Sequence, residues 1–202
     1  MTLKTLRVGA VQVRRMIELA EGQWERSTIE RALVSYGWAR PADESGGVVV
    51  EWGGGPGSPH FFGRAPGDER VGWRIELGGG PTGPEDHSSY VRLPCALFWP
   101  AFGEEPADAD PDDEDELDGQ YGDDWARLPD AARADFHAEY RRIGALIRAE
   151  LGEPLEVTEG ELDEYTESWH LAGLRVTLCR TDDLNSYSHY DVITLGVGPA
   201  RD

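Results

Sequence analysis

The sequence predicts an α+β fold: an antiparallel sheet of about five strands with a long helix packed on one face and two short N-terminal helices. Strand-like runs come in groups and do not alternate with helices, and the run 70–78 alternates apolar and polar residues. A helical apolar stripe covers 129–151. A chain of 202 residues can bury one sizeable core. We therefore expect 1–202 to be a single domain.

The two short helices are predicted near the N-terminus. Over 11–20 the apolar residues recur at helical spacing, as they do on a helix with one buried side. Ser27 and Glu30 then form a Ser-x-x-Glu capping box, which predicts a helix over 28–36. Gly37 suits the left-handed position that commonly follows a helix C-terminus.

Three strands are predicted in the middle of the chain. The run 47–52 is apolar and rich in valine, and the alternation over 70–78 is typical of a half-buried antiparallel strand. A third strand is predicted over 90–102. Because proline cannot donate a ladder hydrogen bond, Pro94 and Pro100 place that strand at an edge of the sheet or at a bulge.

The long helix and two further strands complete the predicted order. The helix over 129–151 is expected to begin at Pro129 or Asp130, since proline favours the first helical turn. Apolar, β-branched runs then predict strands over 171–181 and 189–197.

The charge of the chain is strongly negative, at −20. Residues 103–124 hold twelve carboxylates and no Lys or Arg, and the rest of the chain still carries −8. Such a field repels nucleic acid and anionic membrane surfaces. With Pro106, Pro111 and almost no apolar residues, the segment 103–124 is expected to be a flexible loop insertion.

A cytoplasmic location is expected. Arg14 and Arg15 interrupt what would be the apolar core of a signal peptide, and no apolar run approaches the roughly 20 residues of a membrane-spanning helix. Cys95 and Cys179 lie in strand-like runs, where buried reduced thiols are common.

A calcium loop is the first chemistry to test in the acidic segment. Asp108, Asp110 and Asp112 occupy every second position, as the first three ligands of an EF-hand do. The sixth position should then be glycine and is Asp113, and the twelfth should be glutamate and is Gly119. The segment is therefore no EF-hand, although weak and unselective attraction of divalent cations stays open.

No complete catalytic or cofactor motif is found in the sequence. The glycine-rich run 53–59 lacks the Gly-Lys-Ser/Thr of a phosphate-binding loop. Ser188 and His189 would point to opposite faces of a strand, so they form no nucleophile and base. The histidines show no metal-ligand spacing, and neither cysteine has a Cys-x-x-Cys partner; the five histidines are His60, His87, His137, His170 and His189. We expect no cofactor, no metal and no enzyme.

Two interpretations of the acidic segment compete: a solvated loop that aids solubility, and a docking surface for a basic protein. Carboxylates steer a cationic partner, and aromatic side chains beside them can serve as anchors. The candidate partner-binding residues are Glu104, Glu105, Asp108, Asp110, Asp112, Asp113, Glu114, Asp115, Glu116, Asp118, Tyr121, Asp123, Asp124 and Trp125.

The outline of the chain carries a resemblance. A helical N-terminus ends in Gly37-Trp38, a long helix closes in the Leu-Gly-Glu-Pro of 151–154, and Trp169 precedes the terminal strands. This outline resembles the small acidic immunity proteins that accompany secreted polymorphic toxins in GC-rich bacteria. The resemblance implies a protein that neutralises a cognate toxin by binding it, and it transfers no functional residues.

The expected function is therefore that of a cytoplasmic immunity or inhibitor protein that binds a basic toxin stoichiometrically. An acidic secretion or assembly chaperone, which holds its partner through a sheet edge, is the first alternative. A hydrolytic enzyme built from scattered His and Asp residues is the second. The oligomeric state stays open.

Overall fold

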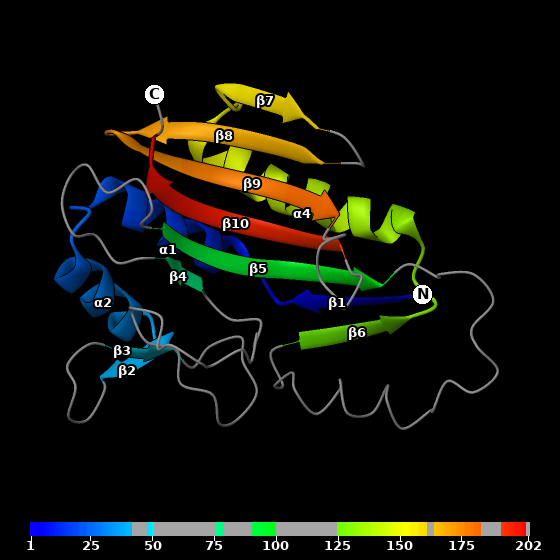
Figure 1. Ribbon diagram of the computed structural model, residues 1–202, viewed down its shortest axis with the longest axis horizontal. Helices are drawn as coiled ribbons and strands as arrows, with labels where there is room; N and C mark the ends of the chain where they lie inside the picture. Colours follow the sequence, from blue (N-terminus) through cyan, green and yellow to red (C-terminus); the bar gives the residue numbers. More distant parts are fainter. Residues whose placement is uncertain are drawn as a thin grey trace.

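The computed structural model describes residues 1–41, 48–50, 76–78, 90–99, 125–160, 164–182 and 191–200. Within these residues the main sheet has eight strands, seven of them in the order β6-β1-β5-β10-β9-β8-β7, with β4 paired to β5 (Figure 1). All pairings are antiparallel. The strands are β1 (Thr2–Leu6), β4 (Glu76–Gly78), β5 (Tyr90–Trp99), β6 (Trp125–Pro129), β7 (Glu156–Glu159), β8 (Tyr165–Leu171), β9 (Leu174–Asp182) and β10 (Asp191–Pro199).

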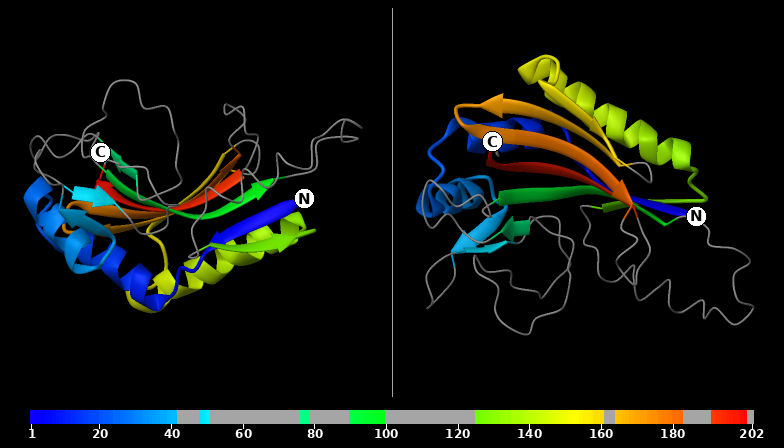
Figure 2. Two further views of the ribbon diagram at one scale, coloured as in Figure 1. Left: turned by 90° about the horizontal axis from the view of Figure 1, so that it is seen from below. Right: turned by 45° about the horizontal axis from the view of Figure 1, so that its top comes forward.

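The helices α1 (Ala10–Glu21) and α4 (Arg133–Leu151) cover the same face of the main sheet (Figure 2). We call it the helix face. The helix α2 (Arg26–Ser35) lies beside a separate two-stranded sheet of β2 (Ala39–Pro41) and β3 (Val48–Val50). The α+β class and the antiparallel sheet are thus confirmed. The sheet has more strands than the five expected, and α1 shares with the long helix α4 the face that was expected to carry the long helix alone.

The core lies between the helix face and α4. Phe136, Tyr140, Ile143 and Ile147 recur at helical spacing and are all at most 3% exposed. The Phe136 ring stacks on Phe98 of β5, with ring centroids 5.6 Å apart. Burial of this apolar stripe, rather than helix propensity, holds α4 on the sheet.

The expected start of the long helix was wrong. Pro129 ends β6, where it pairs with Thr2, and Asp130 has a positive φ of 60°. The helix begins at Arg133, and the Asp135 carboxylate accepts a hydrogen bond of 2.7 Å from the Ala132 amide. Pairing with β1 takes residues 125–129 into the sheet and so displaces the helix start.

The strand expected over 171–181 was also wrong at its N-terminal end. Ala172 and Gly173 form a two-residue turn with φ values of 51° and 86°, and this turn joins β8 to β9. A type I′ hairpin turn requires positive φ at both central positions, which alanine rarely adopts, so the sequence did not reveal this turn.

The strand expected over 90–102 is β5, which ends at Trp99. The bulge is confirmed, because the register with β10 shifts between Ile193 and Thr194, opposite the Pro94–Ala96 stretch. The edge position is wrong, since β5 pairs with β10 on one side and with β1 and β4 on the other. The expected strands 47–52 and 70–78 are described at β3 and β4, and the run 53–59 lies outside the described residues.

The capping box at Ser27 was wrong, and the glycine signal after the same helix is confirmed. Helix α2 begins at Arg26, so Ser27 lies inside it, and Glu30 instead accepts a 2.7 Å hydrogen bond from Arg26. Gly37 has a φ of 71°, and the amide of Trp38 donates to the Leu33 carbonyl at 2.9 Å. This is the Schellman arrangement.

Replacing Gly37 by Ala should lower the free energy of unfolding by about 1 kcal/mol, because a Cβ strains left-handed backbone. A Cβ at Gly37 meets nothing within 4 Å, so the loss has a backbone origin. Urea denaturation measures it. The matched control is Gly22→Ala at the end of α1, where φ is −85° and little change is expected. Equal losses in both variants would contradict the assignment.

Candidate functional site

The acidic segment joins two strands of the folded sheet. Its candidate residues from Glu104 to Asp124 lie outside the described residues. Its flanks are described: β5 ends at Trp99, which pairs with Thr2, and β6 begins at Trp125, which pairs with Leu6. Both flanking strands pair with β1, one on each side, and the two ends of the segment lie opposite the first and the last residue of β1.

Trp125 differs from the other candidates because the structure describes it. Its side chain is 9% exposed and belongs to the core cluster. The sequence placed it as an aromatic anchor beside the charged loop. Since so little of its surface reaches solvent, Trp125 contributes to the core through β6, and its role as a partner anchor stays a prediction.

The histidines within the described residues do not converge. His137 lies on α4, which packs on the helix face. Trp169 pairs with Val176 and lies two residues after Glu167 on β8, so all three side chains are on the helix face. His170, the next residue, pairs with Arg175. His170 therefore points to the opposite face. The other three histidines lie outside the described residues.

The two cysteines are free thiols. Cys95 is fully buried, and its Sγ donates to the Leu93 carbonyl at 3.3 Å. Cys179 is half-buried, and the Thr166 hydroxyl donates to its Sγ at 3.1 Å. Burial raises the pKa of both thiols. A thiol with a raised pKa is a poor nucleophile at neutral pH, so neither sulfur is poised for attack.

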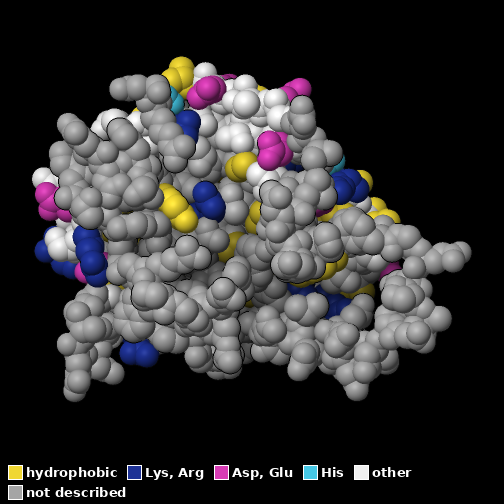
Figure 3. Space-filling model, viewed as in Figure 1, with side chains coloured by type: hydrophobic (Ala, Val, Ile, Leu, Met, Phe, Trp, Pro, Cys, Tyr) yellow, Lys and Arg dark blue, Asp and Glu magenta, His cyan; other side chains and the backbone are white. Residues whose placement is uncertain are grey.

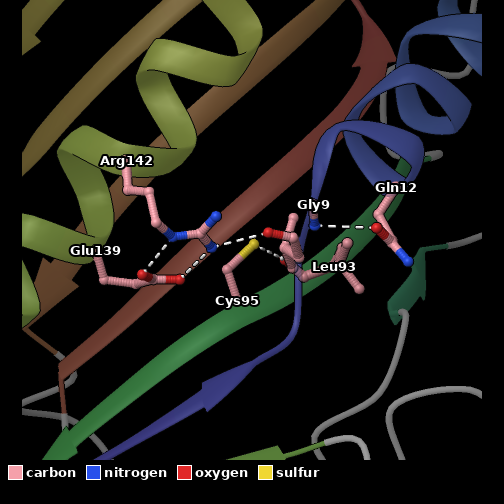
Figure 4. A network of polar contacts seen from close by, with 7 residues as sticks. Gly9, Gln12, Leu93, Cys95, Glu139 and Arg142 are labelled. Atoms are coloured by element: carbon pink, nitrogen blue, oxygen red, sulfur yellow. Dashed lines mark hydrogen bonds and ion pairs between the residues drawn. The ribbon is translucent and has the colours of Figure 1, made fainter.

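A polar network joins α4 to the segment between β1 and α1 (Figure 4). Glu139 accepts two hydrogen bonds from Arg142, of 2.7 Å from Nε and 2.6 Å from Nη2. The same Nη2 donates to the Val8 carbonyl at 2.8 Å. Both oxygens of Glu139 are therefore engaged, which suits a structural clamp rather than a general base.

The two buried carboxylates on the helix face are likewise engaged. Glu167 is 3% exposed, and its Oε2 lies 2.5 Å from Nη2 of Arg148 on α4. Asp191 is 2% exposed and pairs with Arg133 at the start of α4. Within the described parts of the chain, no group of three or more His, Cys, Asp or Glu is placed to hold a metal ion.

The sheet face opposite the helices is polar in its central strands. Register places Arg92, Thr177, Cys179 and Thr194 there, alternating with the apolar residues of the helix face. Figure 3 views this face and shows Lys and Arg side chains among its described residues. Antiparallel sheets commonly present such a face to solvent. Among the residues that the structure describes on this face, Arg92, Thr177, Cys179 and Thr194 form no pair of nucleophile and base.

A second acidic region was missed by the sequence reasoning, although its signal is countable. Residues 153–167 hold seven carboxylates and no Lys or Arg. The described residues of this stretch include β7 and the start of β8, which pair with each other, and β7 ends the strand order of the main sheet. The number of carboxylates can be read from the sequence. The position of this region at a sheet edge cannot, because it depends on the strand order.

In the described part of the chain, no helix has the length and apolar character needed to cross a membrane. No family model matches the chain, and neither a curated protein nor a solved structure shows significant similarity to it. The function is therefore argued from the charges, burial and topology of this chain.

Proposed function

We propose that this chain is a cytoplasmic immunity protein that neutralises a cognate basic toxin by stoichiometric binding. One observation carries the proposal: twelve carboxylates without a Lys or Arg occupy 103–124, between two strands that pair with the same neighbour. Clustered charge of one sign raises the encounter rate with a partner of the opposite sign and disfavours like-charged proteins.

The described polar residues support binding over catalysis. Glu139, Glu167 and Asp191 are each held by an arginine of α4. The Glu167 and Asp191 pairs join the sheet to α4, whereas Glu139 pairs with Arg142 within α4, and Arg142 in turn donates to the Val8 carbonyl. The acidic segment holds twelve carboxylates and no Lys or Arg of its own, and this charge favours contact with a cationic partner.

An acidic chaperone that holds its partner through a sheet edge is the second candidate. It is favoured by β7, whose four residues are all exposed at the edge of the main sheet. Deletion of 104–124 separates the two candidates. The immunity proposal expects a marked loss of binding on deletion, whereas edge binding alone expects none.

The test is the salt dependence of association with a toxin-like secreted protein encoded next to this chain. The association rate constant should fall about tenfold or more between low and physiological salt, because ions screen the attraction. Replacing the twelve carboxylates of 103–124 by Asn and Gln should give a slower rate with little salt dependence. Stopped-flow fluorescence measures both.

The control is Glu21→Gln with Glu25→Gln, two exposed carboxylates at the ends of α1 and α2. This variant should keep most of the rate. Single substitutions in the segment are uninformative, since an exposed ion pair contributes about 0–1 kcal/mol. A wild-type association rate indifferent to salt would refute the steering role.

A further inference from the structure

The edge strand β7 is exposed along its whole length. It pairs with β8 and ends the strand order of the main sheet, and none of the described strands lies beyond it in Figure 1. All four of its residues, Glu156–Glu159, have exposed side chains. An edge strand presents unpaired backbone N–H and C=O groups, which an extended segment of another protein can pair with.

Two apolar side chains lie at this edge. Leu155, just before β7, is 72% exposed, and Val157 within it is 49% exposed. Within the described residues the other large apolar side chains exposed to this extent, at Met1, Val11 and Leu128, lie on other elements. Neighbouring apolar side chains on an exposed edge are a common feature of sites that bind another protein.

The charges around β7 are negative. Glu153 is 85% exposed, and Glu156, Glu159 and Glu164 are exposed as well. Arg148 is the nearby cation from α4, and it pairs with Glu153 at 3.2 Å and with buried Glu167. Its charge is thus committed to the helix side, which leaves the strand edge anionic.

The acidic side chains of β7 determine the charge of a segment that can pair with this edge strand. Charged residues on a short edge strand often prevent unwanted pairing, and a second copy of this chain would bring like-charged strands together. A cationic segment that pairs with β7 is instead stabilised by cross-strand attraction between opposite charges. Glu156 and Thr158 point to the face opposite the helices, while Val157 and Glu159 point to the helix side, as their register with β8 requires.

We propose that β7 binds, by strand addition, an extended segment of the toxin that carries two Lys or Arg residues three positions apart with an apolar residue between them. Such a segment places one cation opposite Glu156, the other opposite Glu159, and the apolar side chain beside Val157. This inference rests on the proposed function and names a second contact surface for the same partner.

The probe is a short synthetic peptide with two lysines three positions apart and valine and threonine between them. Fluorescence anisotropy of the labelled peptide measures its dissociation constant with the full chain. The double variant Glu156→Arg/Glu159→Arg should weaken binding about tenfold or more, through loss of two cross-strand ion pairs. Both side chains are exposed, so the fold is expected to persist.

The matched control is Glu21→Arg/Glu25→Arg, which changes the net charge equally at exposed helix ends and should leave peptide binding unchanged. A peptide with glutamates in place of the lysines, and one with a central proline, should not bind. Amide hydrogen exchange should slow in β7 of the wild-type chain when the lysine peptide is present.

The outcomes separate the two proposals. The variant with the twelve carboxylates of 103–124 neutralised should still bind the peptide while it loses the rapid encounter with the toxin. Failure of the lysine peptide to bind the full chain would overturn the inference about β7, as would equal binding by wild type and the β7 double variant. Either result leaves the salt-dependence test of 103–124 to judge the proposed function.

Discussion

Replacing Arg148 by Ala should lower the free energy of unfolding by about 3 kcal/mol, because it leaves a carboxylate buried without its cation. Glu167 is 3% exposed on the helix face, and its Oε2 lies 2.5 Å from Nη2 of Arg148. Gly144, one turn earlier on α4, makes room for the guanidinium, since a Cβ there would lie 2.9 Å from Nη1.

Two controls isolate the buried contact. Glu153→Gln removes the other carboxylate beside Arg148, but this one is 85% exposed, and a cost below about 0.5 kcal/mol is expected. The double variant Arg148→Met/Glu167→Leu replaces both charges by apolar groups and should lie within about 1 kcal/mol of wild type. Urea denaturation measures all three. Equal costs for Arg148→Ala and Glu153→Gln would show that Arg148 does not offset the burial of Glu167.

The ion pair of Arg148 and Glu167 shows which parts of the fold could be predicted from the sequence and which could not. The stripe of α4 is predictable because Phe136, Tyr140 and Ile143 recur at helical spacing and bury together. Strand β8 is not predictable from the sequence pattern, because its buried positions include Glu167 and Ser168, both 3% exposed. Only the arginine brought in by α4 makes the carboxylate tolerable there, and that contact follows from tertiary structure.

Strand β1 was missed for a similar reason. The segment TLKTL contains Lys4, which sequence patterning assigns to a solvated position. In the fold Lys4 is 4% exposed, and its Nζ lies 5.6 Å from the centroid of the Trp99 ring. An aromatic face stabilises a cation that has lost water, so the lysine is buried within the sheet.

The features of the candidate site are likewise of two kinds, those that can be counted in the sequence and those that depend on strand pairing. The charge of 103–124 can be counted in the sequence, whereas the burial of Trp125 depends on the pairing of β6 with β1. The carboxylates of 153–167 can also be counted. The exposure of Glu156 and Glu159 on a free edge depends on β7 being last in the strand order, which local patterning does not determine.

Replacing Phe136 by Ala should lower the free energy of unfolding by about 4 kcal/mol, through lost burial and the cavity left behind. Phe136 is 1% exposed and stacks on Phe98, with ring centroids 5.6 Å apart. The guanidinium carbon of Arg133 lies 5.1 Å from the Phe98 centroid and 5.9 Å from that of Phe136, while the same arginine pairs with buried Asp191. Truncation thus removes an aromatic contact of the arginine that pairs with the buried Asp191 carboxylate, as well as an apolar contact.

The matched control for this site is Phe136→Leu, which keeps most of the buried volume and should cost about 1.5 kcal/mol. Thermal and urea denaturation of the two variants give the comparison. Because Phe98 is next to Trp99, where β5 ends before the acidic segment, loosening this contact should also speed amide exchange at Phe98 and Trp99. Equal stability losses for alanine and leucine would contradict the cavity argument. Unchanged exchange at these two residues would show that the stacking does not hold the end of β5.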